Sequence, residues 1–339
     1  MSERIEVGNI VVCRGELKKG AIKGVELING VNVDIPVLVM NGAEKGPILV
    51  LMSTQHGIEI QGIDVILKIM REKLNPKKLK GTIIGVPVGN PLAFMHQQYL
   101  SWIDNLDVGR VNADIPNGNA TERLAYALWT EMWSKADMVV NIHCNTRPDS
   151  LIYQAININN PKTNEKLNKM AKAFGVTTII YDEPLREDAP PTLNNLAAQK
   201  GIAVILVELI DGRWISEPST SVGIRGVLNI MKTFKMIDGK SESQYGIPII
   251  PGVNRSYGLI HANRGGLIRF LKKPGELIKK GEVLVEIYDL YGDTVEKVEM
   301  PVDGYVWAYP CGQSFGTSGG LQAVQTGSNI AYAFTHMEK

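Results

Sequence analysis

Short apolar runs alternate with amphipathic segments along residues 48–234, and this alternation limits the possible folds more than any other feature of the chain. Continuous apolar runs are typical of strands buried on both faces, whereas apolar residues at helical spacing are typical of helices packed on a sheet. The pattern therefore predicts an α/β fold, with a mainly parallel sheet covered by helices on both faces. Ligands in such sheets bind at the carboxyl ends of the strands. The predicted strands cover 48–52, 82–88, 138–142, 177–181 and 202–207, and the predicted helices cover 63–74, 121–135, 164–174, 193–200 and 222–234.

Both flanks of this region have a β pattern. Residues 5–12 and 33–40 are rich in β-branched side chains, which predicts an N-terminal β segment within residues 1–45. From about Ser256 onward, short strand-like runs alternate with glycine turns and show no helical period. We therefore expect an α/β domain over 1–245 and a small all-β domain over 256–339, joined by a polar and then proline-rich linker.

Composition excludes several classes of protein. The chain has 339 residues, and its 36 Lys and Arg residues nearly balance its 35 Asp and Glu residues, which argues against a dedicated nucleic-acid-binding protein. The sequence contains neither an apolar run long enough to cross a membrane nor the apolar block of a signal peptide. Its three cysteines are widely spaced, which argues against a disulfide framework and favours the cytoplasm.

Three potential metal ligands follow predicted strands. His56 and Glu59 lie three residues apart in the loop after the first buried strand, and His143 directly follows another strand. Imidazole nitrogens and carboxylate oxygens are good zinc ligands, and a catalytic zinc site takes three protein ligands and leaves one position open. Cys144 is a further possible ligand. Neighbouring residues on a strand point to opposite faces, however, so His143 and Cys144 should not both reach the metal.

A candidate general base ends a third strand. Glu208 follows the apolar run 203–207, which places a partly desolvated carboxylate at the same edge of the sheet. This position suits a group that takes a proton from an attacking water molecule. The alternative is that Glu208 caps a helix or pairs with Arg213. Two histidines and two carboxylates at three strand ends together favour a catalytic site over separate structural roles.

The loop His56-Gly57-Ile58-Glu59 is followed along the chain by Asn90-Pro91-Leu92-Ala93-Phe94, Asp107-Val108-Gly109-Arg110 and Thr121-Glu122-Arg123-Leu124-Ala125, and then by His143 and Glu208. In these segments and in their order, nearly the whole chain resembles the succinylglutamate desuccinylase/aspartoacylase family, which is related to zinc carboxypeptidases. The resemblance implies a zinc-carboxypeptidase-like mixed sheet and one zinc ion per chain, held by His56, Glu59 and His143, with Glu208 as the general base. It also implies that Arg110 holds a substrate carboxylate through its two-point guanidinium fork, and Asn90 and Asn112 are expected beside the substrate.

The sequence departs from the family's pattern at three places. Gly109 stands where the family has Asn before the arginine, and Asn141 stands where the family has Asp two residues before the third ligand. The family often has a further Arg that we expect to stabilise the oxyanion, but residues 94–103 contain no Arg. We therefore expect the substrate to differ from that of the best-known members. The residues that would have to supply the missing donor are His96, Gln97, Gln98, Tyr99, Arg147 and Arg186.

The C-terminal segment has a resemblance of its own, to the barrel-sandwich domains that carry biotin or lipoate. Such carriers modify a Lys in a tight hairpin, but the corresponding stretch 287–294 contains no Lys. We therefore expect no covalent cofactor here, and intact mass spectrometry should show no biotin or lipoate. The domain is expected to cover the mouth of the site or to support assembly.

Together these features predict a zinc-dependent amidohydrolase that removes the acyl group from an N-acylated amino acid or a related small molecule. We expect a homo-oligomer with no nucleic-acid or membrane partner. One alternative is a metallocarboxypeptidase acting on short peptides, because it would use the same metal chemistry. A second alternative is a non-catalytic binding protein that has kept the fold, which the missing oxyanion Arg and Asn141 would favour.

Overall fold

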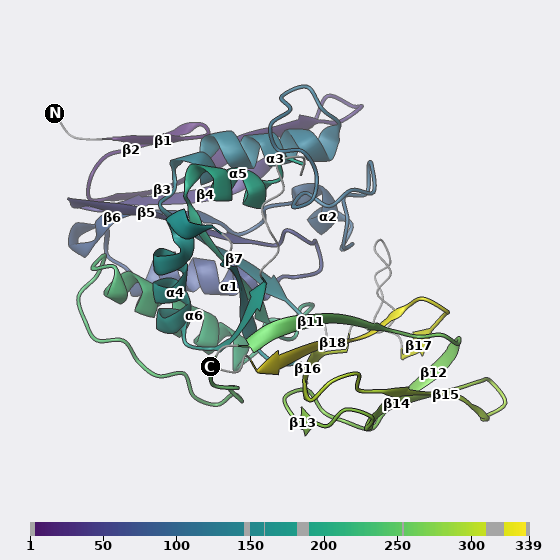
Figure 1. Cartoon of the computed structure of the whole chain (residues 1–339). Helices are drawn as coiled ribbons and strands as arrows, with labels where there is room; N and C mark the ends of the chain where they lie inside the picture. The colour runs from purple at the N-terminus through teal and green to yellow at the C-terminus, as the bar shows by residue number, and fades with distance from the viewer. Residues whose placement is uncertain are drawn as a thin grey trace.

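A twelve-stranded sheet runs through the centre of the fold (Figure 1). The computed structural model describes residues 4–145, 150–158, 160–181, 190–252, 254–309 and 322–336. The strand order in the large sheet is β13-β16-β18-β11-β9-β8-β10-β7-β5-β6-β4-β3. A four-stranded sheet, β15-β14-β12-β17, and the β1-β2 hairpin complete the strands of the described residues. The strands are β1 (Ile5–Val7), β2 (Ile10–Val12), β3 (Glu16–Glu26), β4 (Asn32–Asn41), β5 (Glu44–Ser53), β6 (Lys80–Val86), β7 (Met138–Cys144), β8 (Tyr153–Asn157), β9 (Thr177–Tyr181), β10 (Ala203–Leu209), β11 (Asn254–His261), β12 (Gly266–Phe270), β13 (Leu277–Ile278), β14 (Val283–Tyr288), β15 (Thr294–Glu299), β16 (Gly304–Ala308), β17 (Ala323–Val324) and β18 (Asn329–His336).

The middle of the large sheet is mostly parallel, as the alternation of strands and helices predicts. Strands β10, β7, β5 and β6 pair in parallel, while β8 pairs antiparallel with β10 and parallel with β9. The α-helices of the described residues are α1 (Gln61–Lys68), α2 (Pro91–Met95), α3 (Ala120–Glu131), α4 (Pro161–Phe174), α5 (Leu193–Lys200) and α6 (Ser219–Thr233), and a π-helical turn, Ile69–Lys73, follows α1.

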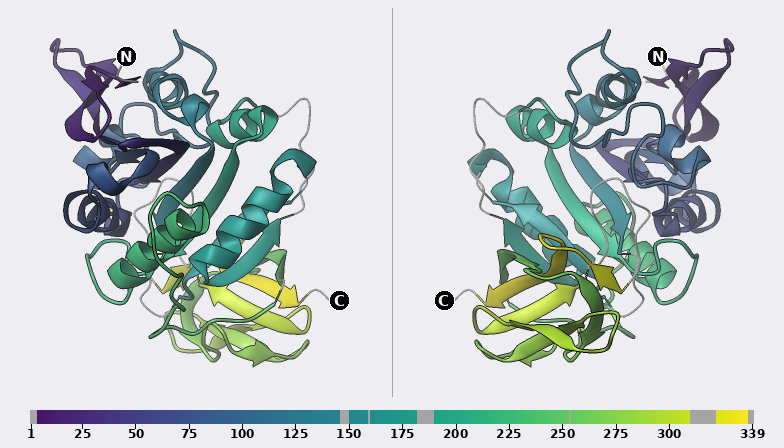
Figure 2. Two further views of the ribbon diagram at one scale, coloured as in Figure 1. Left: turned by 90° about the vertical axis from the view of Figure 1, so that its left-hand side faces the viewer. Right: turned by 90° about the vertical axis from the view of Figure 1, so that its right-hand side faces the viewer.

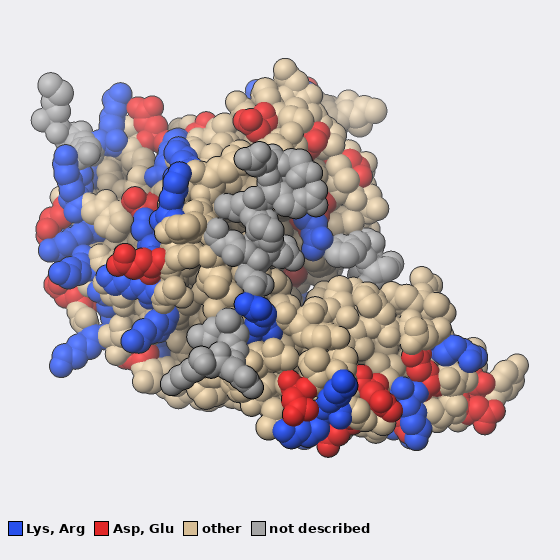
Figure 3. All heavy atoms as spheres, viewed as in Figure 1, with Lys and Arg blue, Asp and Glu red and all other residues tan. Residues whose placement is uncertain are grey.

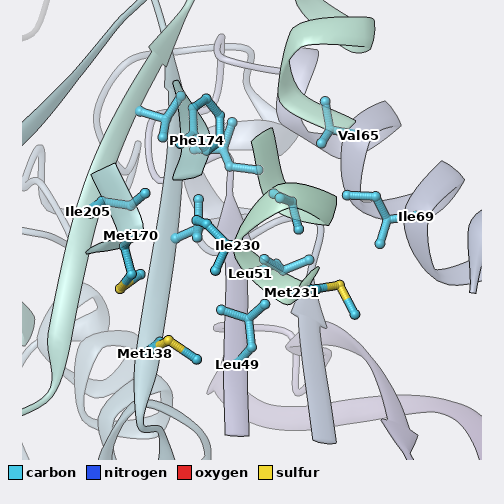
Figure 4. Close-up of a cluster of buried hydrophobic side chains, with 14 of the residues drawn as sticks. Leu49, Leu51, Val65, Ile69, Met138, Met170, Phe174, Ile205, Ile230 and Met231 are labelled. Atoms are coloured by element: carbon cyan, nitrogen blue, oxygen red, sulfur yellow. The ribbon is translucent and has the colours of Figure 1, made fainter. Parts of the chain in front are cut away.

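Helices cover both faces of the sheet because its central strands are apolar on both sides. In β5, Leu49 and Leu51 join one core cluster, while Val50 and Met52 join the other. Helices α1, α4 and α6 pack against the first of these faces, where Figure 4 shows their side chains meeting those of β5, β7 and β10. Helices α3 and α5 and the β1-β2 hairpin cover the opposite face. Figure 2 shows this layered arrangement from two further sides.

Some elements differ from the predicted ones. Residues 5–12, predicted to be β, form two short strands, because the chain turns at Gly8-Asn9 and the two halves pair as a hairpin. Strand β3 was not predicted: its sequence, Glu-Leu-Lys-Lys-Gly-Ala-Ile-Lys-Gly-Val-Glu, is polar because β3 lies at the edge of the sheet. The short elements α2 and β8 were not predicted either, because neither is long enough to show a period.

The C-terminal strands continue the large sheet. Strand β11 pairs in parallel with β9 and antiparallel with β18, so β18, β16 and β13 extend the α/β sheet beyond β9. The remaining C-terminal strands form the smaller sheet, and a separate apolar cluster includes side chains from both sheets. Residues 240–251, predicted as a linker, contain no helix or strand. The division into domains 1–245 and 256–339 stays a prediction, and the β9–β11 pairing shows that backbone hydrogen bonds connect the two regions.

The described surface carries both signs of charge. Figure 3 shows blue and red side chains interspersed on the left of this face and along the lower rim of the C-terminal region. None of the helices in the described ranges combines the length and apolar composition needed to span a bilayer.

Candidate active site

The candidate site lies at the carboxyl ends of three adjacent parallel strands. Strand β5 leads into the loop that carries His56 and Glu59, while β7 ends at His143-Cys144 and β10 contains Glu208. In the β7–β10 ladder, Glu208 is the register partner of His143. Register partners on neighbouring strands point to the same face of a sheet, so these two side chains project into the same space.

Close packing holds the loop after β5 in place. Thr54 adopts a left-handed backbone conformation with φ of 53°, and its hydroxyl donates to the backbone oxygen of Glu59 at 3.0 Å. Gly57 lies against the backbone of α2, where an added Cβ would come within 2.2 Å of Ala93 C and O. The His-Gly-x-Glu sequence therefore needs glycine at its second position for space, and this packing places both potential ligands on one tight turn.

The Glu59 carboxylate lies between two imidazole rings. Its Oε1 is 2.7 Å from His56 Nδ1, and its Oε2 is 2.9 Å from His143 Nδ1. All three residues are buried, and the ligand atoms that they offer lie within 4.8 Å of one another. Two imidazole nitrogens and one carboxylate form the ligand set of several catalytic zinc sites, so this group fits a divalent metal ion.

Asp107 fixes the orientation of His56. Its Oδ2 lies 3.2 Å from His56 Nε2, which leaves Nδ1 directed toward Glu59. A histidine that binds a metal usually donates its second N–H to a carboxylate or carbonyl, which selects the tautomer. His143 Nε2 is buried and has no hydrogen-bond partner among the described residues. Cys144 packs its side chain into the core cluster and burial raises the pKa of its thiol, so only His143 of this pair directs its side chain to the site.

The two carboxylates hold His56 in its charged form when no metal is bound. Burial alone would lower the pKa of His56, but the Glu59 charge and the hydrogen bond with Asp107 raise it to about 10. Burial would raise the pKa of Glu59, but the charges of His56 and His143 lower it to about 2. The pKa of Asp107 is likewise lowered to about 2, because its hydrogen bond with His56 outweighs burial.

These shifts predict how the stability of the metal-free protein depends on pH. The His56 contribution is complete below its ordinary pKa of 6.5 and is lost as the pH rises toward about 10. The contributions of Glu59 and Asp107 are complete above their ordinary pKa values of 4.5 and 3.8 and are lost as the pH falls toward about 2. Melting temperatures of metal-stripped protein should therefore decline in both directions, and Asp107→Asn should reduce the decline. An unchanged pH profile in this variant would contradict the assignment.

Glu208 is half-buried beside this cluster and lines the same cavity. It lies within β10 rather than at a helix terminus, so it does not serve as a helix cap. Burial and the neighbouring Glu59 charge raise the pKa of Glu208 well above its ordinary value. The carboxyl group is thus placed to accept and hold a proton.

A cavity of about 720 Å³ opens at these residues. Val204 and Leu206, on the same face of β10 as Glu208, extend its floor, and α4 and α5 contribute further walls. Trp307 and Tyr332 of the C-terminal strands also line it. The C-terminal region therefore takes part in the walls of the cavity, while the expectation that it covers the mouth of the site stays a prediction.

Tyr99 is the residue from segment 94–103 that the structure brings to this cavity. Its ring stacks on His56 with centroids 3.6 Å apart, and burial with the nearby carboxylates raises the pKa of its hydroxyl, which therefore stays a neutral donor. His96 instead stacks on Trp102. Gln97 and Gln98 are not among the described residues that line the cavity. The remaining two candidate donors, Arg147 and Arg186, lie outside the described residues.

Of the three residues predicted to contact the substrate, only Arg110 is among the described residues that line the cavity. Arg110 lines the cavity, and it also forms an ion pair in which its Nε lies 3.3 Å from Asp107 Oδ2. Asn90 is fully buried and caps α2 by accepting from Ala93 N, while Asn112 accepts from Asp114 N. The described lining residues do not include Asn90 or Asn112. Their role in substrate binding stays a prediction, and the hydrogen bonds described here are local.

Sequence reasoning assigned no role at the site to Asp107, Gln55, Tyr153 or Tyr332. For Asp107 there was a signal, because it begins the Asp-Val-Gly-Arg segment. Gln55 directly precedes His56, whereas Tyr153 and Tyr332 come from separate parts of the chain, and only the folded sheet brings these two to the cavity.

Comparison with known proteins shows what the chain is similar to. Residues 45–234 match the model of the succinylglutamate desuccinylase/aspartoacylase catalytic domain, a range that contains all four candidate metal and base residues. A curated relative, the N-alpha-acetyl-L-2,4-diaminobutyric acid deacetylase of Halomonas elongata, is 24% identical over 269 residues, which cover 79% of this chain and 78% of the relative.

Solved structures confirm the fold class. A succinylglutamate desuccinylase/aspartoacylase from Rhodobacter sphaeroides superposes with a TM-score of 0.80 at 23% identity and covers 95% of both chains. The product-bound ectoine utilization protein EutE from Ruegeria pomeroyi superposes with a TM-score of 0.82 at 19% identity, over 96% of this chain and 98% of that one.

Proposed function

This chain belongs to the succinylglutamate desuccinylase/aspartoacylase family, and we propose that it is a zinc-dependent amidohydrolase that removes the acyl group from an N-acylated amino acid or a related small molecule. The observation that carries the proposal is the buried His56–Glu59–His143 group beside Glu208, which lies in register with His143. A metal-ligand set and a proton acceptor that share one cavity are the minimum that metal-assisted hydrolysis of an amide needs.

His56, Glu59 and His143 would hold one zinc ion per chain. His56 would use Nδ1, because Nε2 faces Asp107. When bound, zinc polarises the scissile carbonyl and lowers the pKa of a water molecule toward ~7. The Asp107 contact keeps the imidazole in the orientation that this role needs.

Glu208 would move the proton. It takes a proton from the attacking water molecule as the water oxygen bonds to the carbonyl carbon, and it gives that proton to the amine as the C–N bond breaks. The products are a carboxylate and a free amine. The raised pKa of Glu208 suits a group that must hold a proton between the two steps. The positive charge of a bound zinc ion would favour the ionised form of Glu208, which is the form that accepts the proton from water in the first step.

Tyr99 is the donor that we propose for the developing oxyanion. Its hydroxyl stays protonated, and stacking on His56 keeps the ring beside the ligand group. A neutral hydroxyl can donate to negative charge on oxygen and so lower the barrier. This assignment accounts for catalysis without an Arg in segment 94–103, and it therefore weakens the case for a non-catalytic protein.

Arg110→Lys tests the proposed contact with a substrate carboxylate. Lysine keeps the charge but loses the two-point fork, so KM should rise several-fold while zinc content and melting temperature stay the same. Arg110 already pairs with Asp107, and its side chain is 66% exposed. If the ion pair is its main role, the Lys variant should instead lower the melting temperature and leave KM unchanged. Steady-state kinetics and thermal melting of the one variant separate these outcomes.

The proposed function is tested by a substrate panel after metal analysis. The panel should include N-acetyl, N-succinyl and longer N-acyl amino acids together with dipeptides, and it should include N-acetyl-diaminobutyrate because a curated relative is named for that deacetylation. We expect zinc near one equivalent and amide hydrolysis of at least one N-acyl amino acid. Cleavage of dipeptides alone would indicate a carboxypeptidase, and metal binding without any hydrolysis would indicate a binding protein.

A further inference from the structure

Gly109 leaves space that a neighbouring side chain fills. Its φ is not in the left-handed region, so the backbone itself does not require glycine. A Cβ at this position, however, would lie 2.2 Å from Gln55 Nε2 and 2.6 Å from Gln55 Cδ. These distances are well inside van der Waals contact, so Gln55 can occupy its present position only because residue 109 has no side chain.

Gln55 uses this space to bridge two polar residues. Its Nε2 donates to Asp107 Oδ1 at 3.3 Å, and its Oε1 accepts from Asn141 Nδ2 at 3.1 Å. Gln55 is only 8% exposed and lines the cavity. The backbone N–H of Gly109 donates to the same Oδ1 at 2.8 Å, so two donors hold this oxygen of Asp107.

The hydrogen bonds from Asn141 to Gln55 and from Gln55 to Asp107 form a series, and the charge of Asp107 sets the direction of both. An ionised carboxylate only accepts, so the Gln55 amide must present its NH₂ group to Asp107 and its oxygen to Asn141. Residue 141 must then donate, which an Asn can do and an ionised Asp cannot. The series ends at the proposed metal site, because the second oxygen of Asp107 contacts His56 Nε2.

We propose that Gln55 is a positioning residue that holds Asp107 against His56, with Gly109 and Asn141 as its matched partners. The inference rests on the proposed function, because it gives His56 the role of a zinc ligand. It also joins the departures at Gly109 and Asn141 into one arrangement. Glycine at 109 provides the space for the Gln55 amide, and the amide at 141 provides the donor that its oxygen needs.

A double-mutant cycle tests whether Gln55 and Gly109 act as one unit. In Gly109→Ala the new methyl group displaces the Gln55 amide and breaks both of its hydrogen bonds, although Gln55 is still present. This variant should therefore weaken zinc binding as much as Gln55→Ala does, by about tenfold, the lower end of the range for groups that support a metal ligand. The double variant should be no weaker than either single variant, because each change removes the same interaction.

Two further variants complete the design. Gln55→Glu keeps the shape of the side chain but places an acceptor against the Asp107 carboxylate, so it should weaken zinc binding at least as much as Gln55→Ala. Gly265→Ala is the matched glycine control, because a Cβ there makes an ordinary 3.4 Å contact with Val324 O, far along the chain. Zinc dissociation constants come from competition with a chromophoric chelator, and melting temperatures of the metal-free proteins monitor folding.

The outcomes separate this inference from the proposed function. Additive losses in the cycle, or wild-type zinc affinity in Gln55→Ala and Gln55→Glu, would overturn the inference while the zinc site stands. Wild-type protein that binds no zinc would overturn the proposed function. The inference would then be judged on the melting temperatures of the metal-free proteins, where equal and non-additive losses support the pair and additive losses overturn it.

Discussion

Glu208→Gln should lower turnover by about 10²–10⁴-fold, the usual cost of losing a general base. Glutamine has nearly the same shape as glutamate, but its amide does not accept a proton at neutral pH. Glu208 lies within β10, in register with His143, and its side chain faces the cavity, so the substitution should leave strand pairing undisturbed. Zinc content and melting temperature should therefore stay close to those of the wild type, and kcat should carry the loss.

A neighbouring residue provides the control for this variant. Leu206 lies two residues before Glu208 on the same face of β10 and also lines the cavity. Leu206→Met conserves volume and should retain most of the activity. A Glu208→Gln protein with near-wild-type kcat would remove Glu208 from the mechanism, and one that loses zinc would show that the residue supports the metal site instead.

Glu59→Gln should abolish stoichiometric zinc binding, and activity should fall to background with it. Glu59 is the anion between the two imidazoles, so its replacement removes a direct ligand as well as the charge that pairs with His56 and His143. Loss of a residue that only supports a ligand already costs 10–100-fold in affinity, and loss of the ligand itself should cost more than ~100-fold. Metal analysis after dialysis, with competition titration, measures the change.

Chelation of the wild-type protein should reproduce this loss, and added zinc should restore activity to the wild type but not to Glu59→Gln. Glu72 is exposed and follows α1, so Glu72→Gln is a suitable control that should keep full zinc content. Retention of one zinc equivalent by Glu59→Gln would show that His56, Glu59 and His143 do not form the ligand set.

The central strands can be predicted from the sequence because they are buried on both faces and are therefore apolar. Strand β7 is buried at every position and β5 at every position from Leu49 to Ser53, and such strands show as continuous apolar runs. Strand β3 lies at the edge of the sheet, where charged side chains such as Lys and Glu can remain in contact with water. Its polar sequence alone therefore does not distinguish it from a loop. The β9–β11 pairing joins residues that lie far apart in the sequence, such as Ile179 and Asn254, so no local sequence pattern predicts it.

Some residues of the candidate site can likewise be predicted from the sequence, and others cannot. His56, Glu59, His143 and Glu208 were found because each lies at or beside the end of an apolar run. The contacts of Asp107 and Tyr99 with His56 depend on how the loops between strands fold back, which spacing does not reveal. The departures at Gly109 and Asn141 are changes at separate positions in the sequence, and only the position of the Gln55 side chain connects them.

The place of β18 in the large sheet has a consequence for how the protein is made. This strand pairs with both β11 and β16 and carries Tyr332 into the wall of the cavity. A ribosome synthesises the loop with His56 and Glu59, β7 and β10 long before it reaches Tyr332. During that interval the nascent chain already contains the candidate site residues, but β11 lacks β18 as a neighbour on one side and presents unpaired backbone groups on which another chain could pair. Pairing of β18 with its neighbours and completion of the cavity wall therefore both wait for the synthesis of this late strand.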